Sequence, residues 1–186
     1  MDYWDRLGWK DPFGSKQMTE AQKAYEKPLA SKGMYTPMIV VSGAIHTSNM
    51  GQAVKRIDDD GKATAAATIT ASGKVRAVNA FVEARVTLPP DVKQAVEVTV
   101  AVAENNLTTE IKAGELKGHT VTEHGVVRFL SRPSTPDKDG NTGFDIPLGG
   151  DWKTANVYLA IVARDPATRK VLGAKRLEWK DLAAVK

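Results

Sequence analysis

Apolar residues alternate with polar ones in several stretches of the second half of this chain, and this pattern constrains the fold more than any other feature. Successive side chains of a β-strand point to opposite faces of its sheet, so a period of two indicates a strand with one buried face. Positions 80, 82, 84, 86 and 88 carry only alanine, valine or leucine. We therefore predict strands over 80–88, 96–102, 126–130, 157–163 and 172–179.

Turn-forming residues separate these stretches. Pro89–Asp91, Lys138–Asn141 and Asp165–Thr168 contain the proline, glycine, asparagine and aspartate residues that favour β-turns. Strands about 10–12 residues apart, with turns between them, are typical of two packed antiparallel sheets. We expect residues 62–182 to form an antiparallel β-sandwich-like domain.

Residues 1–60 have a helical rather than an alternating pattern. Thr19 and Gln22 fit a capping box, in which each side chain satisfies a free backbone N–H at the start of a helix. This predicts a helix over 20–31, kinked at Pro28 and ended by Gly33.

Two further elements are expected before residue 60. The continuous apolar run Met38–Val41 predicts a strand buried on both faces. Ser48 or Asn49 then caps a helix that continues through Ile57, and the acidic run Asp58–Asp60 predicts a solvated turn that ends this part of the chain. The helix carries one apolar stripe: Met50, Ala53, Val54 and Ile57.

Composition excludes several classes of function. Of 186 residues, 42% are hydrophobic and 26% are charged, which is typical of a globular protein. The chain contains no cysteine, so it holds no disulfide, no thiolate and no cysteine-ligated zinc. The net charge of +4 is scattered, without the basic stripe of a nucleic-acid-binding protein. No apolar run approaches the roughly 18–20 residues that span a bilayer.

No motif indicates a metal or a cofactor. His46, His119 and His124 lie far apart in the sequence, whereas a metal site needs three or four converging ligands. The run that starts at Asp137 alternates acidic residues as a calcium loop does, but its sixth position is threonine and its twelfth is leucine. We expect a hairpin turn there. The sequence also has neither a nucleophile elbow nor a glycine-rich phosphate loop.

Two blocks of residues form a distinctive pattern. The first block consists of Asp2–Phe13, Tyr35–Pro37 and Val40–Gly43; the second consists of Glu104–Asn105, Gly114–Glu115, Gly118 and Val126–Arg128. Together they resemble domain of unknown function 1223, an uncharacterised family of mostly secreted, thioredoxin-like bacterial proteins, and the resemblance extends over nearly the whole chain.

The resemblance implies a role for the turn before the strand at 38–41. Thr36-Pro37 would be the cis-proline turn of thioredoxin-like proteins, which faces a Cys-x-x-Cys motif and can present a backbone edge to a bound polypeptide. An ordinary trans proline that opens a strand is the alternative. The implied partner is a polypeptide, the implied location is the periplasm or the exterior, and the implied substrate-facing residues are Tyr3, Trp4, Tyr35, Thr36 and Pro37.

The chain departs from the family pattern at its start. The family's first strand, Cys-x-x-Cys motif and first helix would precede residue 1, so residues 1–60 correspond to an incomplete thioredoxin-like segment. The expected fold class is α+β, with this segment followed by the antiparallel domain. Either the parent protein is longer and redox-related, which we expect, or this is a short form without redox chemistry. A non-catalytic binding or scaffold module that uses the β domain is the alternative function.

Overall fold

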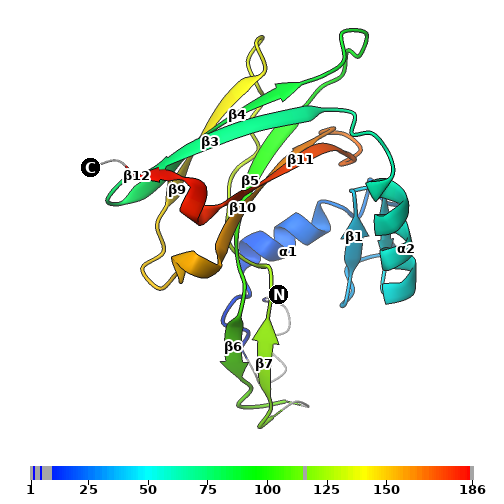
Figure 1. Cartoon of the computed structure of the whole chain (residues 1–186). Helices are drawn as coiled ribbons and strands as arrows, with labels where there is room; N and C mark the ends of the chain where they lie inside the picture. Colours follow the sequence, from blue (N-terminus) through cyan, green and yellow to red (C-terminus); the bar gives the residue numbers. More distant parts are fainter. Residues whose placement is uncertain (1, 3–4, 6–9, 115–116, 185–186) are drawn as a thin grey trace.

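Two four-stranded sheets make up most of the structure (Figure 1). The computed structural model describes residues 2, 5, 10–114 and 117–184. One sheet has the strand order β11 (Val171–Glu178), β10 (Val157–Arg164), β5 (Glu97–Glu104) and β8 (Val126–Leu130). The other has the order β12 (Ala183–Ala184), β3 (Thr68–Val75), β4 (Asn79–Thr87) and β9 (Asn141–Pro147).

The alternating residues form one core between these sheets. Strand β4 contributes Ala80, Val82, Ala84 and Val86, while β10 contributes every second residue from position 157 to 163, and all belong to the same buried cluster. Burying a valine, leucine or isoleucine side chain stabilises a fold by about 1.5–3 kcal/mol. The five predicted strands are confirmed. All neighbouring pairs in the two sheets are antiparallel except β12 with β3, which run parallel.

The alternation did not predict β3 and β9, because a glycine interrupts each pattern: Gly73 on the inward face of β3 and Gly143 on the outward face of β9. Gly73 of β3 leaves room for Leu182, whose Cδ2 atom would lie 2.8 Å from a Cβ at that position. Strands β6 (Leu107–Glu110) and β7 (Thr120–Glu123) form a separate antiparallel pair that projects away from the two sheets (Figure 1). Short helical turns lie at η2 (Thr154–Asn156) and η3 (Trp179–Asp181).

The first helix begins and ends earlier than predicted. Helix α1 spans Lys16–Lys23, and the Oγ atom of Ser15 accepts a hydrogen bond from the Met18 backbone at its start. The predicted capping residues bond elsewhere: the hydroxyl of Thr19 donates to the Asp2 carboxylate, and the Gln22 amide donates to the carbonyl of Tyr35. A series of turns over 24–30 replaces the second half of the expected helix.

The predicted strand at 38–41 is present but is not buried on both faces. Strand β1 (Ile39–Val41) pairs with β2 (Ile45–Thr47) in a two-stranded antiparallel hairpin. Its last residue, Val41, is buried, while Ile39 and Val40 are half-buried. The apolar run therefore covers part of a surface and does not form the centre of a sheet.

Helix α2 (Met50–Gly61) follows, capped by Asn49 as expected; its Oδ1 atom accepts from the Gln52 N–H at 3.0 Å. The acidic run at 58–60 belongs to this helix, so the predicted turn there is wrong. Lys55 and Arg56 lie one helical turn earlier and each pairs with a carboxylate four residues on, at 2.7 Å. Such pairs stabilise a helix by about 0.2–0.5 kcal/mol, which favours continuation of the helix through these residues.

Candidate functional site

The predicted substrate-facing residues that the structure describes lie in one loop before β1. The peptide bond between Thr36 and Pro37 is cis, which confirms the predicted isomer, and both side chains are exposed. Two hydrogen bonds of Tyr35 fix the loop to neighbouring elements. Its hydroxyl lies 2.7 Å from Nδ1 of His46 on β2, and its carbonyl accepts from the side chain of Gln22 of α1 at 2.8 Å. Tyr3 and Trp4 lie outside the described residues.

A second feature connects this part of the chain to the β-sheets. The turn between β1 and β2 contains Ser42 and Gly43, both with positive φ. The Ser42 carbonyl accepts a hydrogen bond from the Val171 N–H at 2.8 Å. A Cβ atom on Gly43 would lie 1.9 Å from the carbonyl oxygen of Arg169, so only glycine allows the two backbones to approach this closely.

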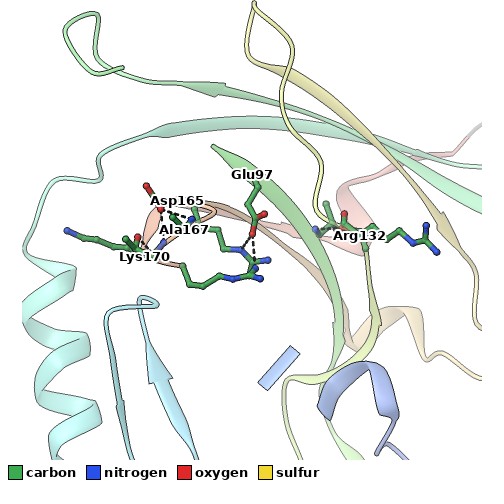
Figure 2. Close-up of polar contacts among 10 residues, drawn as sticks. Glu97, Arg132, Asp165, Ala167 and Lys170 are labelled. Atoms are coloured by element: carbon green, nitrogen blue, oxygen red, sulfur yellow. Dashed lines mark hydrogen bonds and ion pairs between the residues drawn. The ribbon is translucent and has the colours of Figure 1, made fainter. Parts of the chain in front are cut away.

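A charged cluster supports the turn between β10 and β11 (Figure 2). One oxygen of Glu97 lies 2.6 Å from Arg164 and 2.8 Å from Arg169, and all three side chains are largely buried. Asp165 accepts backbone hydrogen bonds from Ala167 and Thr168 within the turn. The hydrogen bonds from Thr168, first its N–H and then its hydroxyl, hold the pKa of Asp165 below its usual value. Because Arg169 also supplies the carbonyl that Gly43 approaches, the cluster holds the turn at the point of this close contact.

The two sequence blocks that carry the family resemblance meet at Arg128 of β8. Its guanidinium group donates to Glu104, which is 0% exposed, at 2.5 Å, and also pairs with Asp151. The other oxygen of Glu104 accepts from the Lys153 N–H at 2.9 Å. The Arg128 guanidinium lies 5.4 Å from the ring centroid of Phe13, within range of a cation–π contact. Arg128 thus connects β5, β8 and the N-terminal segment.

The apolar stripe of α2 lies mostly at the surface. Ala53 is buried, but Met50, Val54 and Ile57 are 66%, 48% and 55% exposed. An amphipathic helix usually packs its apolar stripe against a core. The stripe is therefore a candidate contact surface on this part of the chain.

The outward face of the second sheet contains a hollow of about 600 Å³. Gly143 of β9 lies opposite Glu83 of β4 in the strand register, and both residues line the hollow. The ring of Phe81 lies over this glycine, since its Cζ atom would be 2.8 Å from a Cβ there. Sequence reasoning missed this hollow, because the sequence does not show which polar outward residues lie side by side until the register of β3, β4 and β9 is known.

Possible metal ligands and membrane-spanning helices were sought in the described part of the chain. Across 10–114 and 117–184, no group of three or more histidine, aspartate or glutamate residues is placed to hold a metal ion. The loop at Asp137 is a tight turn, as expected, with its carboxylate accepting from the N–H groups of Asp139 and Asn141. Within the same ranges, no helix is long and apolar enough to cross a membrane.

Three solved structures resemble this fold. Protein AGR_C_4864 from Agrobacterium tumefaciens has a TM-score of 0.63 and 19% identity, and the match covers 95% of this chain and 77% of that one. HBP35 of Porphyromonas gingivalis has a TM-score of 0.64 and 11% identity, over 91% of this chain and 60% of that one. A domain of the outer membrane lipoprotein Omp28, also from Porphyromonas gingivalis, has a TM-score of 0.39 and 12% identity, over 67% of this chain and 93% of that domain. At these identities the first two likenesses show a shared fold alone.

Sequence comparison identifies the family directly. No curated protein matches this chain significantly. The sequence profile described as "Protein of unknown function (DUF1223)" matches residues 1–164, which include the Tyr35–Pro37 loop, the Gly43 turn and the Glu104–Arg128 pair. The chain therefore belongs to the DUF1223 family of proteins of unknown function.

Proposed function

We propose that this chain is the recognition part of a thioredoxin-like, redox-related envelope or secreted protein. In this proposal, residues 1–60 are an incomplete thioredoxin-like segment and residues 62–182 are a β-sandwich-like domain. The chain itself contributes no thiol, because it has no cysteine and the thiolate is the nucleophile in thiol–disulfide exchange. Its contribution is the Tyr35–Pro37 loop, which presents a surface to a polypeptide substrate.

The exposed stripe of α2 is the observation that carries the proposal. Met50, Val54 and Ile57 lie at helical spacing, so they form a single exposed apolar surface on one side of α2. Removing apolar surface from water stabilises a protein by about 25 cal/mol per Å², so a covering layer would be strongly favoured. A preceding strand and helix that carry Cys-x-x-Cys would supply that layer in the intact protein.

The geometry of the loop also supports the proposal. Gln22 and His46 hold Tyr35 from two different elements, so the adjoining exposed residues are kept in one conformation. A rigid loop loses little conformational entropy when it binds a ligand. Thr36 and Pro37 therefore form a preorganised surface beside the edge of the β1–β2 hairpin.

Substitution of Thr36 tests this role. In the intact protein, Thr36→Arg should weaken the binding of an unfolded, carboxymethylated polypeptide by about tenfold, because a long charged side chain would fill the space beside Pro37. The matched control is Thr64→Arg, at an exposed position outside the loop. Fluorescence anisotropy with labelled polypeptide measures both affinities. Equal affinities for the two variants and the unchanged protein would show that the loop does not face the substrate.

A second function, that of a non-catalytic binding module, is favoured by the hollow on the outward face of the β3-β4-β9 sheet. Ligand sites usually have volumes of about 300–1,000 Å³, and this hollow falls within that range. The ligand would bind to residues 62–182 and would require no chemistry at the Tyr35 loop.

A further inference from the structure

From the side chains that line this hollow, we infer that it binds a neutral oligosaccharide. The inference rests on the second function above and names its ligand class. The hollow lies across three strands, with Thr70 and Ser72 on β3, Glu83 and Arg85 on β4, and Asn141 on β9. Hydroxyl, amide, carboxylate and guanidinium groups can all bond to sugar hydroxyls, which both donate and accept hydrogen bonds.

Two of the polar groups are held in place by the neighbouring turn. Nε of Arg85 donates to the Asp139 carbonyl at 3.1 Å. Asp137 accepts two backbone hydrogen bonds, and the one from Asn141 is the main reason that its pKa lies below the usual value. Polar groups that are fixed before binding lose little entropy when a ligand arrives.

The charges in the hollow favour a neutral ligand. Glu83 and Asp137 are negative and Arg85, which lines the same hollow, is positive. An anion would be repelled by the two carboxylates, and a cation would be attracted by them but repelled by the guanidinium group. A sugar without charged groups meets neither penalty and uses all three side chains as hydrogen-bond partners.

One wall of the hollow is apolar. The ring of Phe81 lies over Gly143, in the space that a side chain there would occupy, and lines the hollow beside the polar groups. The C–H groups of a sugar ring are apolar and slightly electropositive, so they pack favourably on the negative face of an aromatic ring. A mixed lining of one aromatic and several polar groups therefore matches the two kinds of surface on a sugar.

The length of the site indicates more than one sugar unit. A second hollow of about 420 Å³ also includes Arg85 and Asp137 in its lining, and continues toward Leu88, Val96 and Pro136. The two hollows thus share Arg85 and Asp137 as a common wall, so a ligand of more than one sugar unit would reach from the first hollow to the second. An extended peptide would fit here less well, because β4 is paired on both sides and its backbone groups are already hydrogen-bonded within the sheet.

Nuclear magnetic resonance titration of the isotope-labelled full chain tests the inference. The probes are cellohexaose and fully N-acetylated chitohexaose, two neutral hexasaccharides, with a neutral glycine–serine peptide of matched length as the third arm. We expect a hexasaccharide to shift the amide signals of Ser72, Glu83 and Gly143 saturably, with a dissociation constant of about 1 mM or lower.

Two substitutions and a matched control locate the binding. Glu83→Ala combined with Arg85→Ala keeps the net charge and should weaken sugar binding by at least about tenfold. Ser72→Trp should do the same by filling the hollow. The control combines Glu110→Ala with Lys112→Ala; both residues are exposed on or beside the β6–β7 hairpin, and binding should be unchanged.

Each other outcome overturns the inference. If the peptide alone shifts the signals of the hollow, the binding module stands and its ligand is not a sugar. If none of the three probes shifts them, the binding function of this hollow fails together with the inference. If sugar binds equally to all variants, the site lies elsewhere on the chain.

Discussion

Replacing Arg128 with methionine is expected to lower the free energy of unfolding by about 3–5 kcal/mol. Glu104 is 0% exposed, and without the guanidinium group its carboxylate keeps, among the described residues, the hydrogen bond from the Lys153 N–H. A buried charge that loses its partner is among the most destabilising changes in a protein core. Methionine preserves most of the apolar stem against Phe13, so the decrease in the free energy of unfolding reports mainly on the ion pair. Urea denaturation measures it as a lower midpoint at constant slope.

Two control variants separate the buried pair from its exposed neighbour. Asp151 is 75% exposed, so Asp151→Asn should cost less than about 1 kcal/mol. The double variant Glu104→Met with Arg128→Met should recover most of the stability, because it removes both charges together. A cost for Arg128→Met as small as that for Asp151→Asn would show that the pair does not organise this junction.

Replacing Gly43 with alanine is expected to separate the β1–β2 hairpin from the turn between β10 and β11. The new Cβ atom would lie 1.9 Å from the Arg169 carbonyl oxygen, and alanine disfavours the φ of +62° found there. Loss of the Ser42–Val171 hydrogen bond adds to the cost, for a total of about 2–4 kcal/mol. Amide hydrogen exchange should show loss of protection at Val171, while the core strand β4 stays protected.

Gly61→Ala is the matched control for this substitution. Gly61 is the last residue of α2, has no positive φ and has no atom close to its Cβ position. Alanine is the better helix former, so stability should stay unchanged or rise by up to about 1 kcal/mol. If Val171 keeps its protection in the Gly43→Ala variant, the close contact between the two turns does not hold the hairpin in place.

Much of the β-structure could be predicted because its strands bury one face. The valines of β5 and the apolar positions of β4 and β10 alternate cleanly, so period alone identified them. Strands β3 and β9 were missed because Gly73 and Gly143 occupy positions where an apolar or polar side chain would have continued the pattern. The alternation of apolar and polar residues does not reveal strands whose packing depends on small residues.

The first 60 residues were harder to predict because competing hydrogen bonds decide their structure. Ser15, rather than Thr19, caps α1, since Thr19 and Gln22 bond to residues distant in the sequence. Of the candidate site, the loop at Tyr35–Pro37 was predicted from the resemblance alone. Glu104 and Arg128 both belong to the second block of the resemblance. Their structural role, which is to join β5 and β8 to the N-terminal segment, became apparent when the structure placed Phe13 beside Arg128.

The intact mass of the protein isolated from its source, before and after thiol alkylation, tests the central claim most directly. The claim is that this chain is the thiol-free recognition part of a longer redox-related protein. It predicts a mass several kilodaltons above the 20.1 kDa of these residues, with a further increase on alkylation. A mass of 20.1 kDa that does not change on alkylation would contradict the claim and leave the β-sheet hollow as the functional site.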